Sequence, residues 1–248
     1  MNVVFHPTCL VDFLAPGVAQ RALHLLQRLG VDVVVPQHSS CCGQPAYNAG
    51  YWEEARRVAA AFVAELTRAL ERGARFVVLP SGSCAGMVVH GYPSLFADAE
   101  PRVRARAGAL RPRVREMSQF LVHVLGVEDV GASFPAKATY HPSCHAIRLL
   151  GLTDEPLRLL RRVRGLVLVD LPYAEDCCGF GGTFSVAVPS VSLAMADEKI
   201  RHVAATGADL LVTGDLGCLL HLRGRLEWLG MSLPVLHWLE VLGGGNPR

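Results

Sequence analysis

The sequence predicts an α/β protein made of two tandem repeats, each built around a parallel sheet. Two observations lead to this fold class. Short apolar segments alternate with longer amphipathic segments along the chain, an order typical of parallel strands covered by helices. The cysteines and the residues beside them also occur twice in the same order, about 135 residues apart, which indicates a duplicated unit.

The first half, residues 1–130, contains three predicted strands and two long predicted helices. Each strand is a short run rich in β-branched residues. Each helix ends before a glycine, Gly30 or Gly73, a residue that commonly closes helices. The predicted strands are residues 2–5, 31–35 and 76–79, and the predicted helices are residues 16–29 and 52–72.

The second half, residues 131–248, repeats this order of strands and helices. Its predicted strands are residues 138–141, 166–170 and 209–213, and its predicted helices lie near residues 156–164, 189–205 and 219–229. The chain is therefore interpreted as two pseudo-symmetric Rossmann-like repeats.

The eight cysteines form two sets of four, with gaps of 32, 1 and 42 residues in the first and 33, 1 and 40 in the second. A His-Pro dipeptide precedes the first cysteine of each set, and a glycine follows each Cys-Cys pair. The first set is Cys9, Cys41, Cys42 and Cys84, and the second set is Cys144, Cys177, Cys178 and Cys218.

Each cysteine lies at, or shortly after, the carboxyl end of a predicted strand. Loops at the carboxyl ends of parallel strands meet at one edge of the sheet, where open α/β sheets bind ligands. We therefore expect the four cysteines of each set to converge. Gly43 and Gly179 give the backbone the freedom for a sharp bend after each Cys-Cys pair.

Composition and charge exclude several classes of protein. Apolar residues make up 51% of the chain, which argues against disorder. No apolar stretch reaches the roughly 18 residues of a membrane span and no signal peptide is evident, so we expect a cytoplasmic protein. The net charge of +2 does not favour a nucleic-acid partner. Six arginines between residues 102 and 115 form either a solvated face or a docking patch for an acidic partner.

Four kinds of chemistry compete for the cysteines. Buried structural cysteine does not explain eight residues at repeating loop positions. Disulfides are disfavoured in a reducing cytosol. Structural zinc usually draws on closely spaced C-x2-4-C pairs, which this sequence lacks. An iron–sulfur cluster contains several irons, so adjacent cysteines can bind different ones, and we favour this interpretation.

Other polar residues beside the cysteines have less specific roles. His6 and His141 recur before the first cysteine of each set and could orient the loop or bond a sulfur. Asp176 and Asp215 could position a substrate or cap a helix. Three further histidines, expected to be surface or packed residues, are His38, His90 and His145.

These cysteine motifs resemble the CCG-domain family of iron–sulfur oxidoreductases, named for its Cys-Cys-Gly motif. Residues 177–185, CCGFGGTFS, are similar to the branch that contains glycolate oxidase iron–sulfur subunits and lactate-utilisation proteins. The bare two-repeat layout looks most like the lactate-utilisation members, and the B subunit of heterodisulfide reductase is a further relative. The resemblance extends from His6 to about His237.

The resemblance implies that all eight cysteines bind a cofactor, with one or two [4Fe–4S] clusters per chain and zinc as a possible substitute. The family pattern ends each repeat with C-x-x-C, whereas this chain has Ser81 and Asp215 at the first of those two positions. The five-thiolate clusters of the heterodisulfide reductase type therefore do not carry over unchanged. An oxygen of Ser81 or Asp215 could serve as an extra ligand, although oxygen is a harder donor than such sites usually take.

The sequence thus predicts an iron–sulfur electron-transfer subunit of an oxidoreductase complex that oxidises a small 2-hydroxy acid, L-lactate to pyruvate by resemblance. The resemblance implies the companion lactate-utilisation proteins B and C, or equivalent redox subunits, as partners. No motif for a flavin or nicotinamide is present, so the subunit is not expected to be active alone. Two alternatives stay open: a zinc-binding or thiol-redox scaffold module, and a heterodisulfide-type disulfide reductase.

Overall fold

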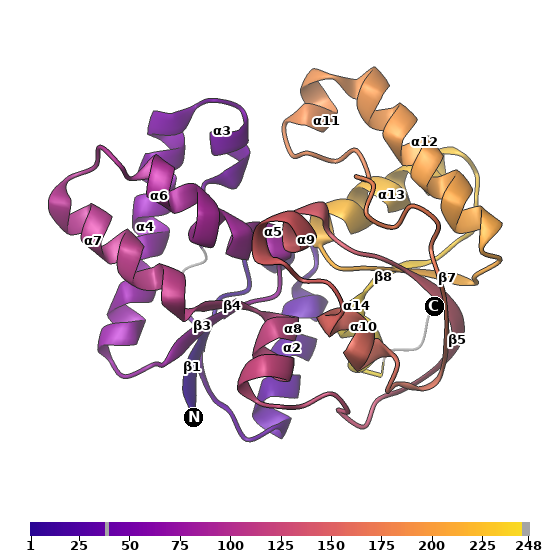
Figure 1. The fold of residues 1–248 in the computed structure, drawn as a ribbon, viewed down its shortest axis with the longest axis horizontal. Coiled ribbons are helices and arrows are strands. Elements are labelled where there is room, and N and C mark those ends of the chain that lie inside the picture. Colours follow the sequence, from indigo (N-terminus) through magenta and orange to yellow (C-terminus); the bar gives the residue numbers. More distant parts are fainter. Residues whose placement is uncertain (38–39, 245–248) are drawn as a thin grey trace. The chain divides into compact units, whose positions relative to one another are not determined.

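The computed structural model describes residues 1–37 and 40–244; His38 lies outside the described residues. The chain divides into two compact units, Met1–Phe120 and Leu121–Arg248. Each unit contains one four-stranded, fully parallel sheet flanked by helices (Figure 1). The predicted fold class, two α/β repeats with parallel sheets, is confirmed.

The sheet of the first unit has the strand order β2-β1-β3-β4. Val4 of the central strand β1 pairs with Val34 on one side and with Val77 on the other. The strands are β1 (Asn2–Phe5), β2 (Asp32–Val34), β3 (Phe76–Leu79) and β4 (Val114–Glu116).

Two long amphipathic helices accompany this sheet, and each buries one face. Helix α4 buries Ala55, Ala59, Phe62 and Leu66, a spacing of three to four residues that places them on one side. The helices of the first unit are α1 (Cys9–Leu14), α2 (Pro16–Arg28), α3 (Gln44–Asn48), α4 (Trp52–Glu71), α5 (Gly82–Gly86), the π-helix η1 (Met87–Gly91), α6 (Tyr92–Leu95), α7 (Pro101–Leu110), the 3-10 helix η2 (Arg111–Arg113) and α8 (Met117–Gln119).

The sheet of the second unit has the equivalent order, β6-β5-β7-β8. Its central strand β5 pairs with β6 and β7, so that Thr139 lies between Val169 and Leu211. The strands are β5 (Ser133–His141), β6 (Arg164–Val169), β7 (Leu210–Thr213) and β8 (Val235–His237). The helices are α9 (Cys144–Leu150), α10 (Glu155–Leu160), α11 (Phe184–Ala187), α12 (Pro189–Ala205), α13 (Leu216–Trp228) and α14 (Trp238–Leu242). The π-helix η3 (Phe120–Val124) spans the boundary between the two units in the sequence.

Two of the differences from the sequence-based prediction concern the sheets. Each sheet has a fourth strand, β4 or β8, which is three residues long and therefore too short to give a periodic pattern. The helix predicted at residues 156–164 is wrong at its end, since α10 stops at Leu160 and Arg164 already pairs with Ser133 in the sheet. Strand pairing thus overrides the helical propensity of the arginine-rich end of this segment.

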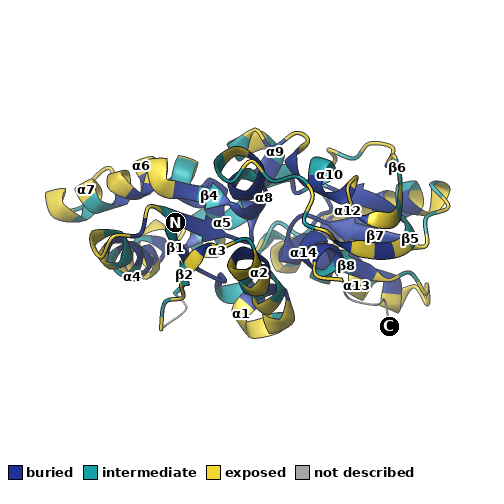
Figure 2. Cartoon of the chain, turned by 90° about the horizontal axis from the view of Figure 1, so that it is seen from below, coloured by how far each residue is buried: buried dark blue, intermediate teal, exposed yellow. Residues whose placement is uncertain are grey.

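The central strands of both sheets form the cores. Val77, Val78 and Leu79 of β3 are fully buried, as are Leu211 and Val212 of β7. Figure 2 shows much of α1 and α7 as exposed, while strands such as β4 and β7 are largely buried. None of the described helices is long and apolar enough to cross a membrane.

Four of the six arginines between residues 102 and 115 satisfy backbone carbonyl groups of the first unit. Arg111 Nε donates to Val89 O at 2.8 Å, and Arg113 donates to Arg75 O at 3.2 Å. Arg104 and Arg115 make equivalent bonds to backbone oxygens. These side chains therefore contribute to local structure while remaining largely exposed.

Replacing Leu79 tests the core of the first unit. We expect Leu79→Ala to lower the free energy of unfolding by about 2–5 kcal/mol, because it leaves a cavity at the fully buried end of β3. Leu14→Ala, at a side chain that is 49% exposed in the same unit, is the matched control and should cost within about 0.5 kcal/mol. Urea unfolding of both variants measures the difference; equal losses would show that β3 is not the core.

Candidate metal or cluster sites

The strand order explains why each set of cysteines gathers at one place. After β1 the chain adds β2 on one side, and it then crosses to add β3 on the other. The crevice at the carboxyl ends of such strands is where open parallel sheets bind ligands. Cys9 follows β1, the Cys41–Cys42 pair follows β2, and Cys84 follows β3. The second unit places its cysteines after β5, β6 and β7 in the same way.

The first set brings its four sulfur atoms into contact. Cys9 Sγ lies 3.5 Å from Cys41 Sγ, and Cys42 Sγ lies 3.4 Å from Cys84 Sγ. Cys42 is buried, whereas the other three side chains are partly exposed. The set thus combines one buried thiol with three that are partly exposed.

The second set is similar but more buried. Cys144 Sγ lies 4.0 Å from Cys177 Sγ. Cys178 and Cys218 are both buried, and their sulfurs lie within 4.8 Å of each other and of a ring nitrogen of His141. Each half of the chain therefore holds four thiols in one group, as the spacing predicts for the cysteines.

Two observations explain why glycine follows each Cys-Cys pair. Gly43 and Gly179 have φ angles of 84° and 91°, which residues with a Cβ rarely adopt. A Cβ on Gly43 would also lie 2.7 Å from Ala55 O of α4, and one on Gly179 would overlap Ser192 O of α12. Each cysteine pair is therefore held directly against the backbone of a long helix.

This bend also directs backbone N–H groups at sulfur. Gly43 N donates to Cys41 Sγ at 3.5 Å, and Gly179 N donates to Cys177 Sγ at 3.4 Å. Cys41 Sγ also accepts hydrogen bonds from the thiols of Cys42 and Cys9. Together these bonds hold the pKa of Cys41 far below its usual value. Cys144 and Cys178 lower the pKa of Cys177 in the same way. Cys41 and Cys177 therefore favour the thiolate form, with neighbouring thiols as donors, and in the second set Cys178 and His141 also lower the pKa of Cys218 to about 7.

His6 supports the first loop through its backbone. Its Nδ1 accepts the N–H of Thr8 at 3.0 Å, and Thr8 has an unusual φ of 69°. Burial lowers the pKa of His6 to about 4, so the ring is neutral at pH 7 with its proton on Nε2. His6 therefore orients the loop that carries Cys9.

His141 differs from its counterpart His6. Both of its ring nitrogens are buried without a hydrogen-bond partner among the described residues. One of them belongs to the group formed with Cys178 and Cys218. His145, expected to be a surface or packed histidine, also approaches a sulfur, with Nδ1 3.8 Å from Cys144 Sγ. His90 is exposed.

Ser81 and Asp215 are helix N-caps. Ser81 Oγ accepts the N–H of Cys84 at 3.4 Å at the start of α5, and Asp215 Oδ1 accepts the N–H of Gly217 at 3.2 Å at the start of α13. Both side chains are buried. Ser81 and Asp215, which stand where the resemblance implies a cysteine, therefore shape the starts of the helices that carry Cys84 and Cys218.

Three functional candidates were not found from the sequence. Tyr92 donates to Cys42 O at 3.2 Å from a fully buried position. Glu65 accepts from Ser40 Oγ at 2.9 Å, beside Cys41. Lys199 is buried and donates to Tyr173 O and Ala174 O, on the loop before Cys177. All three lie far in sequence from the cysteines that they serve, so no local pattern marks them.

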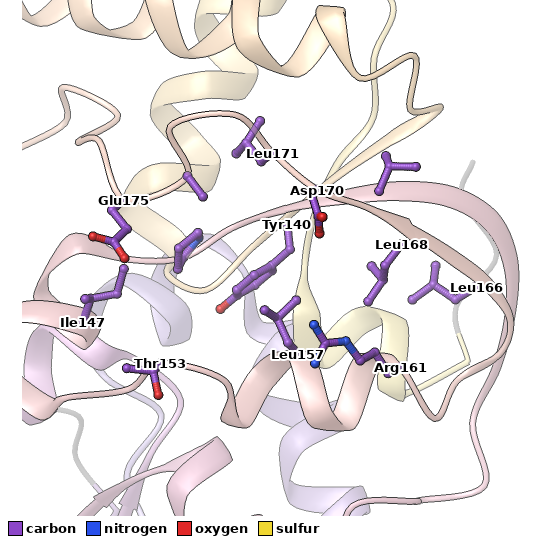
Figure 3. Close-up of a pocket in the computed structure, with 13 residues that line it drawn as sticks. Tyr140, Ile147, Thr153, Leu157, Arg161, Leu166, Leu168, Asp170, Leu171 and Glu175 are labelled. Atoms are coloured by element: carbon purple, nitrogen blue, oxygen red, sulfur yellow. The ribbon is translucent and has the colours of Figure 1, made fainter.

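A cavity of about 470 Å³ lies in the second unit, between β6 and the helices α9 and α10 (Figure 3). Its wall is largely apolar, with Tyr140 near the centre and charged groups from Arg161, Asp170 and Glu175. The volume is typical of sites for small molecules and cofactors. No cysteine lines it, although Pro142 on its wall precedes Cys144 by two residues. A three-carbon acid would fill only a small part of this space.

The donor set suits a metal or cluster held by thiolates. Four thiols converge in each unit, and each set contains a thiol whose pKa lies well below its usual value, Cys41 or Cys177. Two thiolates on one tetrahedral zinc ion are roughly 3.8 Å apart, given zinc–sulfur bonds of about 2.3 Å. The sulfur–sulfur separations of 3.4–4.0 Å in Cys9–Cys41, Cys42–Cys84 and Cys144–Cys177 are close to that value. A cluster of several irons is larger, so the loops must part to hold one.

The fold and the two thiol groups define a two-repeat cysteine-rich α/β protein. The chain belongs to the CCG family of cysteine-rich domains, whose model matches residues 3–89 and 138–223. It is 48% identical to Lactate utilization protein A of Geobacillus kaustophilus over 99% of this chain and all of that protein. It is 47% identical to the protein of the same name from Exiguobacterium sp., over 98% of each chain.

A solved structure agrees with the fold. A hypothetical protein from Helicobacter pylori superposes with a TM-score of 0.64 at 11% sequence identity. The match covers 99% of this chain and 49% of the other, so the present chain spans about half of that protein. At this identity the likeness concerns the fold alone.

Replacing Gly43 tests the contact behind the first Cys-Cys pair. Gly50→Ala is the matched control, because Gly50 has nearly the same φ, 83°, but open space around its Cα. We expect Gly50→Ala to cost about 1–2 kcal/mol of stability from the backbone alone. Gly43→Ala should cost about 1–3 kcal/mol more, from overpacking against Ala55. Denaturant unfolding measures both, and equal costs would contradict the proposed contact.

Replacing Ser81 separates a capping role from a ligand role. We expect Ser81→Ala to cost about 1 kcal/mol, because Cys84 N loses its acceptor, and to leave the bound metal per chain unchanged. Ser94→Ala, at an exposed serine of α6, serves as the control for the substitution itself. Metal analysis and thermal unfolding give the two readouts. A loss of bound metal in Ser81→Ala alone would make Ser81 a ligand.

Proposed function

We propose that this chain is the iron–sulfur electron-transfer subunit of an oxidoreductase complex for lactate utilisation. The observation that carries the proposal is the convergence of four thiols in each unit of a chain whose relatives are named Lactate utilization protein A. We assign the eight cysteines as the ligands, with one [4Fe–4S] cluster for each repeat, residues 1–130 and 131–248. Four thiolates are the usual ligand set of such a cluster.

The chain's own residues supply binding and tuning. The lowered pKa values of Cys41 and Cys177 favour their thiolate forms, so these two cysteines are suited to be the first ligands. The N–H groups of Gly43 and Gly179 point at those sulfurs, and such bonds raise the reduction potential of a bound cluster. When bound, the cluster would accept and pass on single electrons.

The proposed overall reaction is the oxidation of L-lactate to pyruvate, which releases two electrons and two protons. The sequence carries no flavin or nicotinamide motif, so the two-electron step is assigned to a partner with an organic cofactor. We propose the companion lactate-utilisation proteins B and C, or equivalent redox subunits, as those partners. In this arrangement the role of the chain itself is to conduct electrons.

A second candidate function is a zinc-binding scaffold of the same complex. The thiol separations favour it, because they match a tetrahedral zinc site without movement of the loops. It predicts a colourless protein with about two zinc ions per chain, whereas the iron–sulfur proposal predicts a brown protein.

Iron and sulfide analysis decides between the two candidates. After anaerobic reconstitution of the full chain, we expect about eight irons and eight sulfides per chain, from two four-iron clusters. Cys42→Ala and Cys178→Ala should each remove about half of the iron, since each removes a buried ligand from one set only. Fewer than about three irons in the unaltered chain, together with stoichiometric zinc, would overturn the iron–sulfur proposal.

A further inference from the structure

Lysine is rare in this chain, and one lysine is buried beside the second cysteine set. Of the 24 lysine and arginine residues, only Lys137 and Lys199 are lysines. Lys199, on α12, is 1% exposed. A buried ammonium group is costly unless it is hydrogen-bonded. Lys199 meets this requirement by donating to Tyr173 O and Ala174 O, at 2.5 and 3.3 Å.

The charge of Lys199 acts on the second cysteine set. Burial lowers the pKa of Lys199, and the Asp176 carboxylate and the thiols of Cys178, Cys177 and Cys218 oppose that effect. The carbonyl groups that it holds belong to the loop that leads to the Cys-Cys pair. Lys199 is therefore placed both to fix this loop and to give it a positive potential.

The first unit has a different residue at the equivalent position. Gly43 packs against Ala55 O of α4, and Gly179 makes the same contact with Ser192 O of α12. Ala55 and Ser192 are therefore equivalent, and equivalent positions of the two helices lie 137 residues apart. By this register Lys199 corresponds to Phe62. The Phe62 ring is fully buried and packs against the His6 ring, with 4.7 Å between centroids. An apolar ring thus takes the place of the cation.

The same register gives the first unit a carboxylate where the second has a histidine. Glu65 corresponds to His202. Glu65 accepts from Ser40 Oγ, next to Cys41, and its Oε2 lies 4.0 Å from His6 Nε2. The carboxylate therefore supports the first Cys-Cys loop as Lys199 supports the second, with the opposite charge.

Other charged groups near the sites do not cancel this difference. Asp12 adds a second negative charge near His6, and no lysine or arginine is among the groups that act most strongly on Cys9, Cys41 and Cys42. In the second unit Asp176 and Asp215 oppose Lys199, while Arg148 acts on Cys144 as a further cation. The charged groups named here are thus two cations and two carboxylates around the second set, and two carboxylates around the first.

We propose that the two cysteine sets are electrostatically inequivalent, and that Lys199 makes a cluster on the second set easier to reduce than one on the first. The inference rests on the proposed iron–sulfur function. A reduced cluster carries one more negative charge, which a buried cation stabilises and the Glu65 carboxylate opposes.

A redox titration of the reconstituted full chain, followed by electron paramagnetic resonance, tests the order of potentials. Cys42→Ala and Cys178→Ala assign each potential, because each leaves one intact set. We expect two separate potentials, with the higher one belonging to the second set. Equal potentials, or the reverse order, in a chain loaded with both clusters overturn this inference and leave the iron–sulfur function standing. A chain that binds no iron overturns both.

Charge variants test the role of the two residues directly. We expect Lys199→Met to lower the potential of the second cluster and to leave the first unchanged. Lys137→Met is the matched control, since it removes the other lysine, which lies on β5 before the cysteine loop, and should shift neither potential. Glu65→Gln keeps the size of the side chain and should raise the first potential alone.

Lys199→Met is expected to lower one reduction potential, and Glu65→Gln is expected to raise the other. Because the two variants alter different units, each can be read without the other. If Lys199→Met is unstable because the two carbonyl groups lose their donor, Glu65→Gln still gives a decisive shift. A shift in Lys199→Met no larger than that in Lys137→Met, or no upward shift in Glu65→Gln, contradicts the proposed electrostatic control.

Discussion

The contact between each Cys-Cys-Gly bend and the backbone of a long helix is the constraint on which both sites depend. Gly43 lies against Ala55 O, and Gly179 lies against Ser192 O, with no room for a side chain. This contact fixes the paired cysteines relative to α4 and α12, and the sheet brings the remaining two cysteines of each set to the same edge. A strand end, a bend and a helix then determine one position for four thiols.

The bend also sets the chemistry of the thiols. Cys41 and Cys177 each receive a backbone N–H and bonds from neighbouring thiols, so the pKa of each lies well below its usual value. Hydrogen bonds to neighbouring thiols and burial raise the pKa of Cys9, Cys42, Cys144 and Cys178, whereas Cys178 and His141 lower the pKa of Cys218 to about 7. Binding of a metal or cluster must therefore release protons, and the loops must adapt to the size of the bound group.

Duplication has preserved the geometry of the sites more closely than their electrostatics. Ser81 and Asp215 cap equivalent helices, although one is neutral and the other is a carboxylate. Phe62 and Lys199 occupy equivalent places behind the cysteines, one as a packed ring and the other as a buried cation. The backbone positions the thiols in both halves, while side chains behind them are free to make the two sites different.

The sequence by itself determined the α/β class, the two repeats of strand and helix, and the two sets of cysteines at strand ends, because periodicity and repetition are local or directly comparable patterns. It missed β4 and β8, which are three residues long and form only by pairing with β3 and β7. It also could not find Glu65, Tyr92 or Lys199, or decide that Ser81 and Asp215 cap helices. Only the tertiary structure decided these roles, because each depends on which backbone atom lies within hydrogen-bond reach once distant segments have packed together.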